Sequence, residues 1–215
     1  MTPVNEDALA IALLDTKAFH HTPDSPVTFR SGIQSPVYID NRRLIHHPQE
    51  WHRIIDGMRA RIAESGLNFD VIAGIAVGGI PHSSALAWSL SVPSVFVRKE
   101  AKEHGLQGRI DGGNVDGRHV LLVEDMITTG GSSLSGVTAL RAAGATVTDC
   151  LSITSYDLDE ARLAFRSQDV RLWPLVSFRA LLSAAVARGL LDDAARGGIE
   201  AWQRNPREWR ADPDR

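Results

Sequence analysis

Hydrophobic residues follow two alternating patterns along this chain. Short apolar runs rich in β-branched residues predict strands, and longer stretches with apolar positions three or four residues apart predict helices between them. Strands that alternate with helices favour a parallel sheet covered by helices. The pattern therefore predicts an α/β fold with a doubly wound core. The predicted core strands are 71–75, 94–97, 119–124 and 146–154, with a short strand at 170–175 after them.

The predicted helices surround these strands and extend beyond them. Two short runs at 27–30 and 37–40 predict a hairpin in a small N-terminal hood. We expect a single domain, with the hood at about 1–45, the core at about 46–180 and C-terminal helices to about 204. The charged last residues should lie on the surface. The predicted helices are 5–19, 49–64, 81–90, 132–143, an amphipathic helix just after Tyr156, 178–188 and 192–203.

Composition fits one globular domain with a packed core, since the 215 residues are 43% hydrophobic and 23% charged. The net charge of −3 offers no global field for nucleic acid or an anionic membrane. Acidic residues at 6, 7 and 15 argue against a signal peptide or a membrane span at the N-terminus. The single cysteine, Cys150, excludes an internal disulfide, and its apolar neighbours predict a buried strand position. We expect a soluble cytoplasmic protein.

The stretch 120–133 joins an apolar strand, two adjacent carboxylates and a hydroxyl-rich glycine loop. Residues 128–133 lie at the N-terminus of a predicted helix, where free backbone N–H groups and the helix dipole favour a phosphate monoester. Glu124 and Asp125 fall at the carboxyl end of the strand, and ionised carboxylates accept hydrogen bonds from ribose hydroxyls. The combination predicts a site for a sugar phosphate. An ordinary strand-turn-helix with solvated acids is the alternative.

A cationic segment follows the predicted strand 94–97. Arg98, Lys99, Lys102 and His104 lie in a connection of about twenty residues, and connections of this length are usually functional lids or disordered segments. These cations are suited to neutralise a pyrophosphate leaving group. A solvated charged loop is the alternative.

Three segments carry a resemblance to a known family. Residues 120–133 resemble the phosphoribosyl pyrophosphate motif of the type I phosphoribosyltransferases. Residues 98–105 resemble the mobile catalytic loop of the orotate phosphoribosyltransferases, with the pattern Arg-Lys-x-x-Lys-x-His-Gly. Residues 29–40 are similar to the Ser-Gly-x-x-Ser-Pro-x-Tyr hairpin of the same branch, near its orotate pocket. The resemblance extends from about residue 5 to about residue 204.

The resemblance implies a type I phosphoribosyltransferase-like core, with a mostly parallel sheet flanked by helices and a small N-terminal hood. The implied reaction is transfer of the phosphoribosyl group from phosphoribosyl pyrophosphate to orotate, forming orotidine 5′-monophosphate and pyrophosphate in UMP biosynthesis. Mg²⁺ would be held mainly by substrate oxygens, with no metal site made by the protein. The paired histidines at 20–21 and 46–47 are interpreted as surface residues, because adjacent residues do not face one ion.

The resemblance also implies a role for each matching residue. Glu124 and Asp125 would hold the ribose hydroxyls. Lys102 and Asp125 would be catalytic, with Lys102 and His104 supplied by the neighbouring subunit of a homodimer. Thr128 and Arg30 would bind orotate. The residues implied to bind phosphoribosyl pyrophosphate are Arg98, Lys99, Lys102, His104, Glu124, Asp125, Met126, Ile127, Thr128, Thr129, Gly130, Gly131 and Ser132.

Two segments depart from the family pattern. Val77-Gly78 stands where many relatives have Tyr-Lys, so a lysine that helps to hold pyrophosphate is absent, and backbone N–H groups are the remaining candidates. Residues 155–158 stand where other relatives place an arginine for the orotate carboxylate. Arg30 and a backbone nest are the candidates for that role, unless Arg30 is a solvated strand-end residue. The rival functions are transfer to another base and a non-catalytic sensor of phosphoribosyl pyrophosphate.

Overall fold

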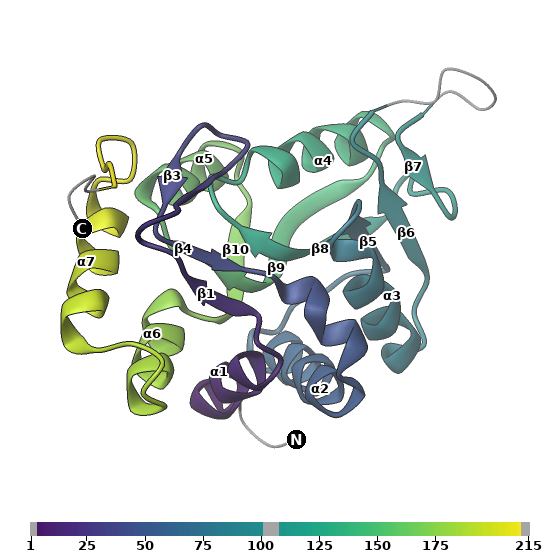
Figure 1. The fold of residues 1–215 in the computed structure, drawn as a ribbon. Helices are drawn as coiled ribbons and strands as arrows, with labels where there is room; N and C mark the ends of the chain where they lie inside the picture. Colours follow the sequence, from purple (N-terminus) through teal and green to yellow (C-terminus); the bar gives the residue numbers. More distant parts are fainter. Residues whose placement is uncertain (1–3, 101–107, 212–215) are drawn as a thin grey trace.

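A six-stranded sheet forms the centre of the computed structural model, which describes residues 4–100 and 108–211. The strand order is β10-β9-β8-β5-β6-β7 (Figure 1). Neighbouring strands are parallel except for β6 and β7, which are antiparallel. The predicted α/β fold with a mostly parallel sheet is therefore confirmed. The strands are β5 (Val71–Ile75), β6 (Ser94–Val97), β7 (Ile110–Asp111), β8 (His119–Ile127), β9 (Thr146–Ser155) and β10 (Arg171–Val176).

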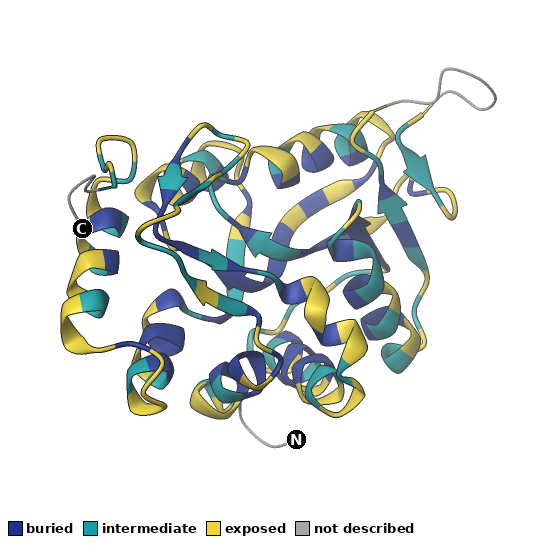
Figure 2. Cartoon of the chain, in the orientation of Figure 1, coloured by how far each residue is buried: buried dark blue, intermediate teal, exposed yellow. Residues whose placement is uncertain are grey.

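Helices cover both faces of the sheet, because successive strand residues point to opposite sides. Leu121 and Val123 belong to the larger apolar cluster, with residues of α1, α2, α3 and α6. Val120 and Leu122 belong to the second cluster, with residues of α4 and α5. The inward faces of these helices are dark blue in Figure 2. The helices are α1 (Glu6–Asp15), α2 (Pro48–Glu64), α3 (Gly79–Leu90), α4 (Gly131–Ala142), α5 (Asp159–Ser167), α6 (Phe178–Ala187) and α7 (Asp193–Arg204).

The N-terminal strands pair differently from the predicted hairpin. Strand β1 (Phe19–His21) pairs with β4 (Val37–Ile39), and β2 (Val27–Thr28) pairs with β3 (Gln34–Ser35). The predicted pairing of 27–30 with 37–40 is wrong, because the second strand of that pair finds its partner further upstream. The first helix also ends at Asp15, short of residue 19, since the chain becomes extended in β1. Short elements β7 and η1 (Asn41–His46) were not predicted.

Residues distant in the sequence hold these N-terminal strands over the sheet. The Ile39 N–H donates to the Tyr156 hydroxyl at 3.1 Å, and Trp202 Nε1 donates to the Gln34 carbonyl at 2.7 Å. The rings of Tyr156 and Trp202 are 5.5 Å apart. The polar tip of each buried ring therefore has a partner, as buried Tyr and Trp require. Of the region predicted as the hood, these strands and η1 span residues 19–46, and from here on the hood means these residues only. The wider division into hood, core and C-terminal helices stays a prediction.

No helix in the described ranges is long and apolar enough to cross a membrane. Cys150 is buried in β9, as its neighbours predicted.

Candidate active site

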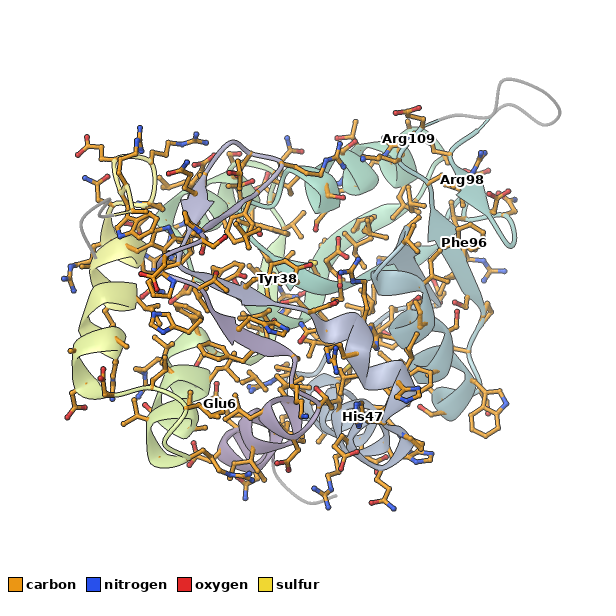
Figure 3. The ribbon with its side chains drawn as sticks, in the orientation of Figure 1. Glu6, Tyr38, His47, Phe96, Arg98 and Arg109 are labelled. Atoms are coloured by element: carbon orange, nitrogen blue, oxygen red, sulfur yellow. The ribbon has the colours of Figure 1, made fainter. Side chains whose placement is uncertain are left out.

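Two adjoining cavities open under the hood at the carboxyl ends of the central strands. The larger has a volume of about 1010 Å³ and is lined by the hood, by the segment after β5 and by the end of β6. The smaller, of about 570 Å³, is lined mainly by the loop between β8 and α4. Arg30, Lys99 and Thr128 line both, so the two cavities adjoin each other along these residues. In Figure 3, Tyr38 extends from the hood strand β4, while Arg98 and Arg109 lie across from it beyond β6.

The two adjacent carboxylates lie within β8 rather than at its end. The strand continues to Ile127 because Met126 and Ile127 pair with Thr154 and Ser155 of β9. Both carboxylates line the larger cavity. Glu124 is only 5% exposed and accepts hydrogen bonds from the Ser133 hydroxyl and the Asp125 backbone N–H, each at 3.2 Å. Glu124 therefore faces α4, and Asp125 faces α3.

Burial has a clear electrostatic consequence for this pair. Desolvation, assisted by the charge of Asp125, raises the pKa of Glu124 well above its usual range. Two carboxyl groups so close together favour a ligand that brings hydroxyl donors or positive charge. A ribose with two neighbouring hydroxyls meets that requirement, whereas a bare phosphate does not.

Two glycines allow the start of α3 to approach these carboxylates. A Cβ on Gly78 would collide with the Asp125 carboxylate, and one on Gly79 would lie 2.7 Å from the Val123 carbonyl oxygen. Gly78 stands where the sequence resemblance places a lysine in many relatives, and a side chain there would require the Asp125 carboxylate to move. Val77 is 79% exposed, and with Gly78 it brings no charge to the cavity wall.

The loop after β8 is built to approach an anion. Gly130 has φ +82°, a conformation that L side chains rarely adopt, and a Cβ there would lie 2.7 Å from the Phe165 ring. Helix α4 starts at Gly131, so its free backbone N–H groups open toward the smaller cavity. The lining residues include all the loop positions that the sequence indicated: Met126, Ile127, Thr128, Thr129, Gly130, Gly131 and Ser132.

The described cations of the predicted lid lie at its base. Arg98 Nε is 2.7 Å from Asp111 Oδ2, and Arg98 Nη2 donates to the Gly108 carbonyl at 2.7 Å. Arg98 and Lys99 line the larger cavity. Lys102 and His104, which the sequence predicted in the lid, lie outside the described residues.

Several residues of the site were not singled out from the sequence. Arg42 and Asp40 line the larger cavity from the hood, and Phe96 lines it from β6. Arg109 lines the smaller cavity, where its Nη1 donates to the Ser135 hydroxyl at 2.9 Å. Buried Asn41 donates to the Asp125 carbonyl at 2.6 Å and so ties the hood to β8. The one sequence signal for the site residues in the hood was the hairpin motif at 29–40, which indicated a position near the orotate pocket.

The side chains that could bind a metal ion are scattered over the described part of the chain rather than clustered. This part contains no group of three or more His, Cys, Asp or Glu side chains that could hold an ion together. The paired histidines contact rings instead, since His20 stacks on Tyr38 and His46 meets His47 edge-on.

A mostly parallel sheet whose central strand carries a carboxylate pair just before a glycine-rich anion loop indicates a protein that handles ribose phosphates. The family model of the phosphoribosyl transferase domain matches residues 43–169. The orotate phosphoribosyltransferase of Coxiella burnetii is 39% identical over 201 residues, covering 94% of this chain and 96% of that protein. That of Listeria innocua is 36% identical over 204 residues, covering 95% and 98%.

Solved structures give the same result. The crystal structure of orotate phosphoribosyltransferase from Aeropyrum pernix has a TM-score of 0.72 at 28% identity, covering 86% of this chain and 99% of that one. The structure of Leishmania donovani UMP synthase has a TM-score of 0.79 at 25% identity, covering 92% of this chain and 43% of that one. The chain belongs to the orotate phosphoribosyltransferase family of phosphoribosyltransferases, as its sequence motifs indicated.

Proposed function

We propose that this chain transfers the phosphoribosyl group from phosphoribosyl pyrophosphate to a ring nitrogen of orotate. The products are orotidine 5′-monophosphate and pyrophosphate, so the reaction serves pyrimidine nucleotide synthesis. The observation that carries the proposal is that the two cavities adjoin each other, which places an anion loop next to a carboxylate pair beneath the hood. A sugar phosphate can span both compartments while a planar base enters from the hood side.

The loop and the carboxylates would bind the sugar phosphate in a fixed position. In the proposal, residues 126–132 surround the 5′-phosphate with backbone N–H groups and hydroxyls. Glu124 and Asp125 accept or share hydrogen bonds with the ribose hydroxyls. The raised pKa of Glu124 means that this group can hold a proton and donate as well as accept. Positioning of this kind removes much of the entropic barrier to transfer.

The cations would act as the glycosidic bond breaks. The transition state resembles an oxocarbenium ion, and the departing pyrophosphate gains negative charge. Arg98 and Lys99 lie on the cavity wall where that charge would develop. We assign Lys102 as the catalytic cation and His104 as its neighbour on the pyrophosphate, from the lid pattern alone. Closure of the lid would exclude the water that otherwise hydrolyses the activated sugar.

Mg²⁺ fits this arrangement as a partner of the substrate. The half-buried Asp125 and the buried Glu124 supply carboxylate oxygens beside the sugar site, and Mg²⁺ favours a few carboxylates together with water and phosphate oxygens. When bound mainly by pyrophosphate and ribose oxygens, Mg²⁺ would neutralise the leaving group.

We also propose a cytoplasmic homodimer with shared active sites, in which Lys102 and His104 enter the partner's cavity. The free, buried thiol of Cys150 is compatible with a reducing compartment. Coexpression of Asp125→Asn and Lys102→Ala chains tests the sharing, because heterodimers would rebuild one intact site. Activity no higher than the sum of the two variants, with heterodimer present, would refute it.

The function is tested by incubating the protein with phosphoribosyl pyrophosphate, Mg²⁺ and one base at a time. We expect nucleotide formation with orotate and little or none with uracil, adenine or hypoxanthine. A different preferred base would support the rival transferase function. Binding of phosphoribosyl pyrophosphate without turnover of any base would support the rival sensor function. The Asp125→Asn variant controls for a contaminating enzyme.

A further inference from the structure

The carboxylate of orotate needs a positively charged partner. The arginine that the resemblance assigns to this role in relatives is absent from this chain. Residues 155–158 stand where relatives carry an arginine, and here they are committed to other contacts. Tyr156 and Leu158 are buried, and the Tyr156 hydroxyl is bonded to the Ile39 N–H. Asp157 is paired with Arg162 at 3.7 Å. The segment therefore brings no positive charge to the cavity.

Arginines line the larger cavity on two sides. Arg98 lies on the far wall, next to Lys99 and bound to Asp111, where the pyrophosphate is proposed to leave. Arg30 and Arg42 lie on the hood side. Arg30 also lines the smaller phosphate cavity, whereas Arg42 lines only the larger one. Of the two hood arginines that line these cavities, Arg42 is therefore the one that does not line the smaller phosphate cavity.

Two contacts fix the guanidinium of Arg42. Its Nε donates to Asp40 Oδ1 at 2.6 Å, and its Nη2 donates to the Tyr38 hydroxyl at 3.0 Å. An arginine has five N–H donors, so donors of both terminal nitrogens are still available. Tyr38 lines the same cavity and presents an aromatic ring beside the guanidinium. A flat ring that packs on Tyr38 would bring its edge to Arg42.

We infer that Arg42, oriented by Asp40 and Tyr38, binds the carboxylate of the pyrimidine and makes the site selective for orotate over uracil. This inference rests on the proposed function. A planar guanidinium matches a carboxylate in two parallel hydrogen bonds, and such charge-assisted bonds are stronger than neutral ones. The acids Asp40 and Asp125 face the same cavity and would repel an anionic base, so a fixed cation is needed there.

The test compares two nucleotides that differ only in this carboxylate, orotidine 5′-monophosphate and UMP. Turnover of orotate by the unaltered protein is measured first, so failure of the proposed function appears there. Calorimetry then gives both affinities for the unaltered protein and for Arg42→Gln. We expect the preference for orotidine 5′-monophosphate to fall by about 10- to 100-fold, the range for one charged hydrogen-bonding partner. The affinities for UMP and phosphoribosyl pyrophosphate should remain within about twofold.

Three variants make this test specific. Arg59→Gln changes another partly exposed arginine, 42% exposed against 56% for Arg42, and should leave the preference unchanged. Arg42→Lys keeps the charge and should recover part of the preference. Arg30→Gln should weaken both nucleotides alike. An unchanged preference in Arg42→Gln would overturn the inference. A selective loss in Arg30→Gln alone, or weaker binding of phosphoribosyl pyrophosphate in Arg42→Gln, would also overturn it.

Discussion

The loop after β8 and the hood form two walls of one site, and they are built in opposite ways. The loop wall is a continuous piece of chain, in which carboxylates, glycines and a helix start lie within residues 124–133. The hood wall is a set of short strands held by distant residues, including Tyr156 and Trp202. The first wall is therefore a local motif, and the second depends on the tertiary structure of the whole chain.

This difference separates the recognition of the two substrates. The loop wall offers backbone N–H groups and carboxylates, which suit a sugar phosphate shared by many enzymes. The hood wall offers Tyr38 and Arg42, which suit one particular base. Damage to the loop wall should weaken phosphoribosyl pyrophosphate binding, and damage to the hood ties should weaken base binding.

The largest expected effect comes from Asp125→Asn, which removes one of the two carboxylate charges of the loop wall. Loss of a charge-assisted hydrogen bond is worth about 1.5 to 3 kcal/mol, so affinity for phosphoribosyl pyrophosphate should fall about 10- to 100-fold and most turnover should disappear. The fold should remain, because the Asp125 charge that the variant removes is unfavourable in the free protein, where it lies next to Glu124 and raises the pKa of that group. Calorimetry and thermal unfolding measure both quantities. Unchanged affinity would remove the acidic pair from the sugar site.

A second prediction concerns the structure behind Asp125, where His82 is fully buried and accepts a hydrogen bond from Trp51 Nε1 at 3.0 Å. Burial lowers the pKa of His82 to about 4, against 6.5 unperturbed, while the charge of Asp125 opposes that shift. Between pH 6.5 and about pH 4, His82 therefore binds a proton in the unfolded chain but not in the folded chain. Stability from this source is complete above pH 6.5 and is lost as pH falls toward 4, by on the order of 3 kcal/mol.

Urea unfolding at pH 7 and pH 4.5 measures this loss. His82→Gln should reduce the difference between the free energies of unfolding at these two pH values. The exposed His52 on α2 provides the control, and His52→Gln should keep the pH dependence of the unaltered protein. The same loss of stability between pH 7 and pH 4.5 in all three proteins would show that His82 does not contribute to the pH dependence.

The third prediction breaks the loop wall at its backbone. Gly130→Ala places a Cβ at φ +82° against the Phe165 ring, so the free energy of unfolding should fall by about 1 to 3 kcal/mol and phosphoribosyl pyrophosphate should bind more weakly. Gly131→Ala is the matched control for stability, because nothing lies within 4 Å of its Cβ position. Chemical denaturation compares the two. Similar stabilities would mean that the loop can relax around the new side chain.

The smallest expected effect comes from a hood tie. Tyr156→Phe removes the acceptor of the Ile39 N–H bond and should cost about 0.5 to 1.5 kcal/mol of stability. Because the hood carries the proposed base contacts, the KM for orotate should rise a few-fold while that for phosphoribosyl pyrophosphate stays constant. Steady-state kinetics separates the two. A parallel rise in both KM values would contradict the division between the walls.

The same division explains what the sequence could predict. The loop wall could be predicted because its functional residues are neighbours in the sequence, and the sheet could be predicted from apolar strands alternating with helices. The hood could not be predicted: in place of the expected pairing of 27–30 with 37–40, the structure has two separate strand pairs. Short strands carry little periodicity, so long-range partners decide their pairing. Arg42 shows no local signal either, since its role depends on Asp40, Tyr38 and the cavity that they line.

The extension of β8 was also beyond local reasoning. The strand was expected to end at residue 124, at the first charged position, yet it continues through Asp125 to Ile127. Pairing with β9 satisfies the backbone groups of this extension, and the Ser133 hydroxyl and the Asp125 N–H are the hydrogen-bond partners of the buried Glu124 carboxyl. A carboxylate inside a strand is unusual by composition, and here it coincides with the proposed sugar site.

The most direct test of the two-wall account is a crystal structure with orotidine 5′-monophosphate bound. We predict that the 5′-phosphate binds the backbone of residues 128–132, that the ribose hydroxyls bind Glu124 and Asp125, and that the base lies under the hood with its carboxylate at Arg42. A phosphate bound away from that loop, or a base on the Arg98 side of the cavity with the hood uninvolved, would contradict it.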